Sequence, residues 1–342
     1  MRIAIVGLGV SGAIASLLLS SHSLAQMKLD AYDLQRLYDK PCGEATPITT
    51  IPILLSRRLP VPRILNTINN IIFKIDDLLR EIRYNSIWLI IDKSEWINRM
   101  RGMIKTANNI NIIYKRTSPK ELSRIGCYDI ILDCRGPYIE DPRGSVIALR
   151  CYTDSLNISK DEALLYYDSR LRCLVWAFPK GCKYNVGYGC LRISKVGHKV
   201  LRSLLLKAGV EVIDIYHCRA APIRIASRFR KPYYTGKSLV IPLGEAAGLV
   251  RPLGGEGIRP SILSSIIAVD LMLEGTFTLR RYIEKLAKII NDIVLGRVVL
   301  KFINHSPRAA KRLLRKASDE ILMKYFTDFL SPNVLLKMLL KP

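Results

Sequence analysis

The chain opens with short apolar runs that alternate with a segment of helical character. The first run, "RIAIVG" at 2–7, is rich in β-branched residues and ends on glycine, which predicts a buried parallel strand. The segment "SGAIASLLLSS" that follows predicts a helix, and "MKLDAYD" predicts a second strand that ends on Asp33. The order expected here is therefore strand, glycine turn, helix, strand and acid.

Strand and helix patterns continue to alternate further along. We predict strand, helix and strand over 86–114, a buried strand with a turn over 128–137, and strand, glycine-rich loop and helix over 237–273. Residue types alternate on both sides of a "PKG" turn within 172–193, which is typical of an antiparallel hairpin. From Thr278 onward the pattern is almost wholly helical and basic.

Length and composition indicate two folded domains, or one large α/β domain with an inserted sheet. The 342 residues are 49% hydrophobic and 24% charged, which excludes a disordered chain. The net charge of +24 fits two interpretations. One is attraction to an anionic partner, and the other is the Lys- and Arg-rich solvated surface typical of thermophiles.

Eight cysteines are scattered without a C-x-x-C pair, and no His/Glu cluster accompanies them, so the sequence predicts no metal site. Cys173, Cys182 and Cys190 lie close enough along the chain for a disulfide across the hairpin. Disulfides of this kind occur in intracellular proteins of hyperthermophiles.

The spacing G-x-G-x-x-G between the first strand and helix carries the clearest chemical signal. Gly7 permits a tight turn, Gly9 lets the backbone approach a pyrophosphate, and Gly12 allows the helix to pack closely on the strand. Asp33 follows Gly12 by 21 positions, where an acid bonds a ribose, and this favours FAD or NAD over NADP. We therefore predict dinucleotide binding at this turn.

The uncharged run from Ile3 to Ser21 also has features of a signal peptide or a membrane anchor. Three glycines in six residues make a poor membrane helix, and cleavage would remove the phosphate-binding turn. We expect no signal peptide and no transmembrane segment. The expected location is cytoplasmic, either free or peripheral on the cytoplasmic membrane face.

Four motifs in order resemble those of the geranylgeranyl reductases. They are the N-terminal glycine turn, "KPCGEA" at 40–45, "LVWAFPKG…NVGYG" at 174–189 and "GEAAGLVRPLGGEGI" at 244–258. These FAD-dependent enzymes have a fold like that of the p-hydroxybenzoate hydroxylases. The archaeal branch that saturates digeranylgeranylglycerol phospholipids is the most similar, and the resemblance spans roughly residues 1–285.

Together the patterns and the resemblance predict an α/β fold in three parts. A Rossmann-type FAD-binding domain (1–46, 88–146 and 215–280) is interrupted by an antiparallel β-sheet substrate domain (47–87 and 147–214). A helical C-terminal region (281–342) follows. The basic segments 307–326 and 334–342 in that region fit either docking on an anionic membrane or a helical cap with a solvated outer face.

The resemblance implies a set of site residues. Those expected to bind FAD are Gly7, Gly9, Gly12, Ala13, Asp33, Cys42, Gly43, Ala45, Lys93, Glu245, Gly255, Gly257 and Ile258. Those expected to line the isoprenoid site are Trp176, Phe178, Pro179 and Gly189. Cys42 is the candidate for a catalytic role in proton delivery, with a buried small hydrophobe as the alternative interpretation.

Several positions depart from the family pattern. Glu245 stands where the family has aspartate, and Lys93 stands where it often has arginine, which removes a bidentate fork. Leu171 and Leu174 replace a proline and a tyrosine, and the chain is shorter than usual between Gly136 and Trp176. These changes suggest a divergent member with a trimmed substrate cavity.

The expected activity is FAD-dependent saturation of C=C bonds in geranylgeranyl chains for lipid biosynthesis. NAD(P)H and reduced ferredoxin stay open as electron donors, and no nucleic-acid partner is expected. One alternative is a flavin monooxygenase or hydroxylase of the same fold. Another is a non-enzymatic basic protein with a vestigial flavin fold that contacts membrane or nucleic acid. The sequence leaves the oligomeric state open.

Overall fold

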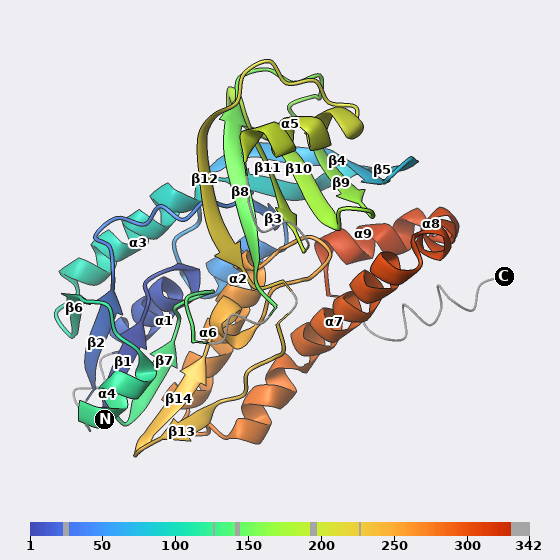
Figure 1. Ribbon diagram of the computed structural model, residues 1–342. Helices are drawn as coiled ribbons and strands as arrows, with labels where there is room; N and C mark the ends of the chain where they lie inside the picture. The colour runs from blue at the N-terminus through green and yellow to red at the C-terminus, as the bar shows by residue number, and fades with distance from the viewer. Residues whose placement is uncertain (23–26, 126, 141–143, 192–196, 226, 330–342) are drawn as a thin grey trace.

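The computed structural model describes residues 1–22, 27–125, 127–140, 144–191, 197–225 and 227–329. Two β-sheets dominate it (Figure 1). The six strands of the first are β1 (Arg2–Val6), β2 (Lys28–Asp33), β6 (Ile110–Tyr114), β7 (Ile130–Asp133), β13 (Tyr233–Thr235) and β14 (Ser238–Pro242). Their order is β13, β14, β7, β1, β2, β6. All neighbours pair in parallel except β13 and β14, so this six-stranded sheet is of Rossmann type.

The second sheet has eight strands and is mostly antiparallel. They are β3 (Ala45–Pro47), β4 (Ile64–Ile75), β5 (Leu78–Ile91), β8 (Val146–Thr153), β9 (Glu162–Asp168), β10 (Cys173–Lys180), β11 (Lys183–Cys190) and β12 (Tyr216–Ile223). Their order is β12, β8, β11, β10, β9, β4, β5, β3, and β4 and β9 form the parallel pair. The predicted hairpin is therefore present as β10 and β11, joined at the "PKG" turn.

Nine α-helices and one short 3-10 helix lie in the described part of the chain. They are α1 (Val10–Ser20), α2 (Thr50–Ser56), α3 (Lys93–Thr106), α4 (Pro119–Ile125), α5 (His198–Lys207), the 3-10 helix Gly244–Ala247, α6 (Ile258–Leu273), α7 (Leu279–His305), α8 (Pro307–Lys316) and α9 (Asp319–Thr327). None of the helices described here is long and apolar enough to cross a membrane. Residues 334–342 lie outside the described residues.

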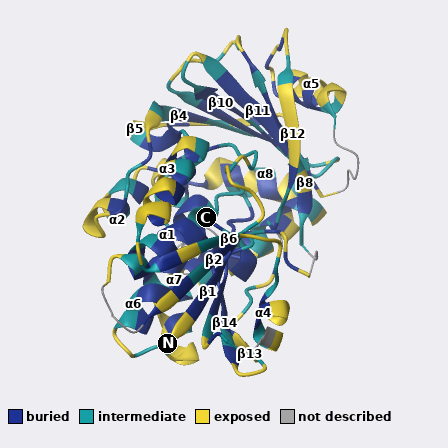
Figure 2. Cartoon of the chain, turned by 90° about the vertical axis from the view of Figure 1, so that its left-hand side faces the viewer, coloured by how far each residue is buried: buried dark blue, intermediate teal, exposed yellow. Residues whose placement is uncertain are grey.

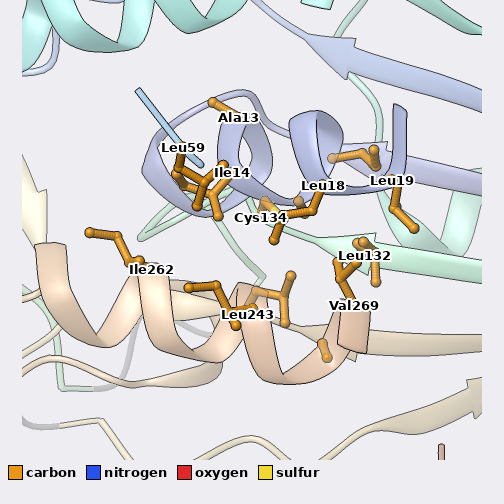
Figure 3. Close-up of a cluster of buried hydrophobic side chains, with 14 of the residues drawn as sticks. Ala13, Ile14, Leu18, Leu19, Leu59, Leu132, Cys134, Leu243, Ile262 and Val269 are labelled. Atoms are coloured by element: carbon orange, nitrogen blue, oxygen red, sulfur yellow. The ribbon is translucent and has the colours of Figure 1, made fainter. Parts of the chain in front are cut away.

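Alternation along β1 divides the core around the six-stranded sheet. Ile3 and Ile5 point into a cluster shared with α1, α3, α6 and α7, whereas Ala4 and Val6 face the opposite side with Leu122 of α4. Figure 3 shows the cluster where α1 and α6 meet. Because α1 is covered on most sides, its residues are buried almost throughout (Figure 2), which explains the uncharged run in the sequence.

The eight-stranded sheet is covered differently on its two faces. One face packs on Leu201, Leu204 and Leu205 of α5. The other packs on the C-terminal helices α7, α8 and α9, for example through Phe326 of α9. In Figure 1 these helices run from the six-stranded sheet to the edge of the eight-stranded one. They therefore cover only part of that second face.

Two disulfides join neighbouring strands of the eight-stranded sheet. Cys173 and Cys190 are register partners on β10 and β11, so the predicted bridge across the hairpin is confirmed for this pair. Cys182 remains a free and exposed thiol. The second disulfide, between Cys151 and Cys218, joins β8 to β12 and was not expected from the sequence.

Candidate active site

A cavity of about 1080 Å³ is lined by residues of both sheets. The six-stranded sheet contributes the carboxyl ends of β1 and β2 with the turns that follow. The eight-stranded sheet contributes the face that α7, α8 and α9 leave uncovered, including Trp176. Ligands of open α/β sheets bind outside the carboxyl ends of the strands, so this cavity is the candidate site.

The glycine turn closes one wall of the cavity. Gly7 has a φ of 96°, and its N–H donates to Tyr32 O at 2.7 Å. A Cβ on Gly7 would lie 2.6 Å from the Cys134 carbonyl oxygen, whereas Gly9 has only the Tyr38 ring edge at 3.7 Å. Gly9 is the N-cap of α1 and supplies no side chain to cap it. The first N–H groups of α1 are therefore placed to bind an anion such as a pyrophosphate.

Asp33 lies at the end of β2, as predicted, and is held in a dense polar network. Its Oδ2 accepts from Leu8 N at 2.6 Å and from Arg101 Nη2 at 2.7 Å, and its Oδ1 accepts from Gln35 N at 3.0 Å. Arg101 also donates through Nε to Leu8 O at 2.9 Å. Arg101 thus ties α3 to the glycine turn and orients the Asp33 carboxylate beside it.

Glu245 holds a second charged pair in the cavity wall. Its Oε2 pairs with Lys40 Nζ at 2.8 Å, and its Oε1 accepts from Arg224 N at 3.0 Å. Burial alone would lower the pKa of Lys40, but Glu245 and Tyr38 together outweigh burial and the pKa is raised. The longer acid at this position therefore places its carboxyl group at the cavity, paired with a buried lysine.

Cys42, Glu44 and Lys93 form a compact polar cluster. Cys42 Sγ accepts from Glu44 N at 3.4 Å, and the Lys93 ammonium lies near enough to interact electrostatically with Cys42. Burial opposes the charge on Lys93, yet Cys42, Tyr38 and Glu44 together raise its pKa above the ordinary value. Glu44 also forms an ion pair with Lys180. Lys93 is thus a permanently charged neighbour of the thiol.

Asn185 fixes the segment that carries Cys42. Its Nδ2 donates to Cys42 O at 2.8 Å and to Gly43 O at 3.3 Å, and its Oδ1 accepts from Trp176 Nε1 at 3.0 Å. A Cβ on Gly43 would lie 3.0 Å from Phe178 Cε2. The 42–44 segment is therefore packed against β10 and β11 of the eight-stranded sheet.

Most of the residues predicted for the site meet at this one cavity. Those lining it are Gly7, Gly9, Asp33, Cys42, Gly43, Ala45, Lys93, Trp176, Phe178, Gly189, Glu245, Gly255, Gly257 and Ile258. Gly12, Ala13 and Pro179 lie behind its walls. Gly12 and Ala13 are buried within α1, and Pro179 is buried in β10.

Several charged lining residues were missed by sequence reasoning. Arg101 is one, and its signal is an arginine four positions after Ile97 on the buried face of α3. Arg150 is another, on β8 at a spacing of two from the cavity-lining Ala148. Glu44 lies inside the "KPCGEA" motif but had no role assigned to it.

A second, apolar cavity of about 130 Å³ adjoins the first under α7, α8 and α9. Side chains such as Phe73, Leu314 and Phe326 line it. Leu165 and Leu174 of the eight-stranded sheet line both cavities. The large cavity and the apolar pocket therefore lie side by side along one face of this sheet.

No protein-family model and no curated protein matches this sequence. Solved structures do match. A geranylgeranyl bacteriochlorophyll reductase-like protein from Thermoplasma acidophilum has a TM-score of 0.69 at 14% identity, over 99% of this chain and 95% of that chain. PqsL from Pseudomonas aeruginosa, a probable FAD-dependent monooxygenase, has a TM-score of 0.62 at 15% identity, over 91% and 98%. A single-residue variant of HpxO from Klebsiella pneumoniae, complexed with FAD, has a TM-score of 0.64 at 12% identity, over 95% and 97%.

These similarities establish the fold, and at such low identities they establish the fold alone. The predicted α/β class, with a Rossmann-type sheet, an inserted antiparallel sheet and a helical C-terminal region, is confirmed. The narrower resemblance to the geranylgeranyl reductases stays a prediction.

Proposed function

We propose that this protein is an FAD-dependent reductase that saturates C=C bonds of geranylgeranyl chains in lipid biosynthesis. The observation that carries the proposal is the apolar pocket that lies beside the large cavity and shares Leu165 and Leu174 with it. A long hydrocarbon chain has no polar groups to satisfy, and the pocket under α7, α8 and α9 is walled almost wholly by apolar side chains. The four sequence motifs support the same assignment.

The residues that line the large cavity fit FAD by their chemistry. The Gly7–Gly9 turn and the start of α1 suit the pyrophosphate, and Asp33 suits a ribose because a carboxylate can accept further hydrogen bonds beside Arg101. Gly255 and Gly257 precede α6 in the cavity wall and leave room for a ring system against the backbone. When bound, FAD supplies hydride-transfer chemistry.

The protein's own part in the reaction is to hold the chain, exclude water and supply a proton. Leu165, Leu174 and Trp176 offer an apolar surface between the cofactor region and the inner pocket. Cys42 is the candidate proton donor, since its thiol lines the cavity. Lys93 lines the same cavity, and its raised pKa keeps its ammonium group positively charged.

Anaerobic turnover tests this proposal. The FAD-loaded protein is incubated with dithionite and a digeranylgeranyl lipid, and the lipid is analysed by mass spectrometry. We expect mass gains of two hydrogens per reduced double bond, and unchanged double bonds would refute the reductase assignment. Trp176→Ala, which removes apolar surface beside the inner pocket, should raise KM for the lipid.

Aerobic turnover separates the reductase from the flavin monooxygenase alternative. The similarity to PqsL and HpxO keeps that alternative chemically reasonable. A monooxygenase would consume oxygen and add an oxygen atom to its substrate, whereas the reductase should work equally well without oxygen. Protein that takes up no FAD at all would refute both assignments.

We also propose that α8 docks on an anionic membrane, where prenyl lipids reside. Arg308, Arg312, Arg315 and Lys316 are exposed on this helix. Cations on a surface helix attract anionic lipid, each contributing about 1 kcal/mol near the surface. Flotation with vesicles containing anionic lipid should retain the protein, and neutral vesicles should not. Equal flotation with both would refute this electrostatic docking.

A further inference from the structure

Arg150 is a buried arginine that faces the cavity and, among the described residues, has no carboxylate partner. It is 7% exposed, and in the part of the chain that the structure describes its Nε has no hydrogen-bond partner. Its guanidinium stacks on the Tyr152 ring at 4.2 Å from the ring centre. A buried cation with only an aromatic face beside it is costly, because desolvation of the charge is not offset by an anion.

Two other buried arginines have such anions. Arg101 pairs with Asp33 at 2.7 Å, and Arg251 pairs with Asp292 at 2.8 Å. Beside Arg150, the register partner Arg219 on β12 already occupies the carboxylate of Asp39 in an ion pair. Within the described ranges, Arg150 is therefore left without an anion to match its charge.

The sheet register places Arg150, next to Arg219 of the edge strand β12, in a graded row of side chains. Moving across the sheet from Arg150 on β8, the register partners are Gly187, then Trp176, then Leu165, then Phe73. Directly opposed residues on neighbouring strands share one face. The row thus runs from a cation at the large cavity to apolar side chains at the inner pocket.

Gly187 is what allows the two ends of this row to approach each other. A Cβ at Gly187 would lie 2.2 Å from Trp176 Cζ2 and 2.3 Å from Leu149 O. The Trp176 indole therefore lies over the glycine and extends toward Arg150. A ligand that spans this row meets a guanidinium first and hydrocarbon surface afterwards.

We propose that Arg150 binds the anionic headgroup of an amphipathic substrate, a phosphate ester, whose apolar chain crosses Trp176 toward the inner pocket. This inference rests on the proposed function and adds a head-group requirement to it. A guanidinium matches phosphate in geometry, and hydrogen bonds between charged groups are the stronger ones. The FAD pyrophosphate has its own site at the Gly7–Gly9 turn on the other sheet, so this would be a second anion site.

Calorimetric titration of the FAD-loaded protein with three probes tests the inference. The probes are geranylgeranyl monophosphate, geranylgeraniol and inorganic phosphate, and the variants are Arg150→Met and Arg150→Lys. We expect Arg150→Met to weaken binding of the monophosphate by about 10- to 100-fold and to leave geranylgeraniol binding unchanged. Arg150→Lys should retain part of the preference because it keeps the charge.

Lys183→Met is the matched control. Lys183 lies 4.1 Å from the centre of the same Tyr152 ring, yet it does not line the cavity. Its loss removes the same charge and should leave monophosphate binding unchanged. An equal effect of both substitutions would mean a general electrostatic field and would overturn the inference.

The outcomes separate this inference from the proposed function. If no prenyl probe binds or is reduced, the proposed function fails. If both prenyl probes bind equally to wild type and Arg150→Met, the headgroup assignment fails while the reductase proposal stands. If inorganic phosphate binds as tightly as geranylgeranyl monophosphate, the site recognises small anions. The proposal that it binds an amphipathic phosphate ester is then wrong. If Arg150→Met stays folded but loses FAD, Arg150 belongs to the cofactor site and the inference is wrong.

Discussion

Replacing Gly12 by alanine tests how closely α1 packs on the glycine turn. A Cβ at this position would lie 1.8 Å from Gly7 O and 2.9 Å from Gly7 C. Real Cβ atoms keep at least about 3.0 Å from such atoms, so turn and helix must separate by at least about 1.2 Å, from 1.8 to 3.0 Å. Because the contacted atoms belong to the backbone, no change of side-chain rotamer relieves the clash.

Two opposing effects set the size of the change. Glycine to alanine inside a helix stabilises by about 1 kcal/mol, whereas overpacking costs about 1–3 kcal/mol. Since the displaced atoms are rigid backbone, we expect a net loss of about 1–2 kcal/mol for Gly12→Ala. At roughly 2–4 °C per kcal/mol, this lowers Tm by about 2–8 °C.

Gly102→Ala is the matched control, because Gly102 is an exposed helical glycine in α3 and a Cβ added to it would meet nothing within 4 Å. Gly102→Ala should stabilise the protein only through the higher helix propensity of alanine, and should raise Tm by a few degrees. Thermal unfolding followed by circular dichroism measures both variants, and flavin absorbance after desalting measures FAD retention. We expect Gly12→Ala to melt below wild type and to retain less FAD. A Gly12→Ala protein that melts as high as Gly102→Ala and retains FAD fully would refute the close packing.

Three further outcomes are expected. The pKa of Lys93 is raised in the folded protein despite burial. The contribution of the charged Lys93 to folding stability is therefore fully present below the ordinary lysine pKa. It is lost only as the pH rises through the higher pKa of the folded state. The Tm difference between wild type and Lys93→Met should therefore stay constant from about pH 6 to about pH 9, and a difference that shrinks in this range would contradict it. Asp292→Ala removes the carboxylate that pairs with buried Arg251. It should lower the free energy of unfolding, measured by urea titration, by about 3–5 kcal/mol. A loss of less than about 1 kcal/mol would contradict a tight ion pair. Cys173→Ser breaks the bridge to Cys190 and should melt below wild type without reductant, by the equivalent of about 2–4 kcal/mol, with the gap closing when reductant is added.

Local patterns in the sequence predicted the part of the site that is built locally. The glycine turn and Asp33 belong to one strand–helix–strand unit, so spacing alone predicted that they meet. Cys42 and Glu245 are far apart in the chain, and the family motifs brought them to one cavity. The pattern of hydrophobic and polar residues alone would not have predicted that Cys42 and Glu245 lie in the same cavity.

Features that depend on pairing between distant strands could not be predicted. The disulfide between Cys151 and Cys218 needs β12 to pair with β8, and the two cysteines are 67 positions apart. The position of Arg150 in the candidate site likewise depends on Gly187 and Trp176. These residues become its neighbours only through the register of β8, β11 and β10. Alternation within one strand says which face a side chain occupies and says nothing of which strand lies next to it.

The order of the strands in the two sheets has a consequence for how the protein is made. The chain passes from the six-stranded sheet to the eight-stranded sheet and back twice, with β14 inserting beside β7 after more than two hundred residues have been synthesised. Neither sheet can be completed from one continuous stretch of chain emerging from the ribosome. The edge of β7 stays unpaired until Ser238–Pro242 has been synthesised. We therefore expect slow folding and a strong dependence of the nascent chain on chaperones.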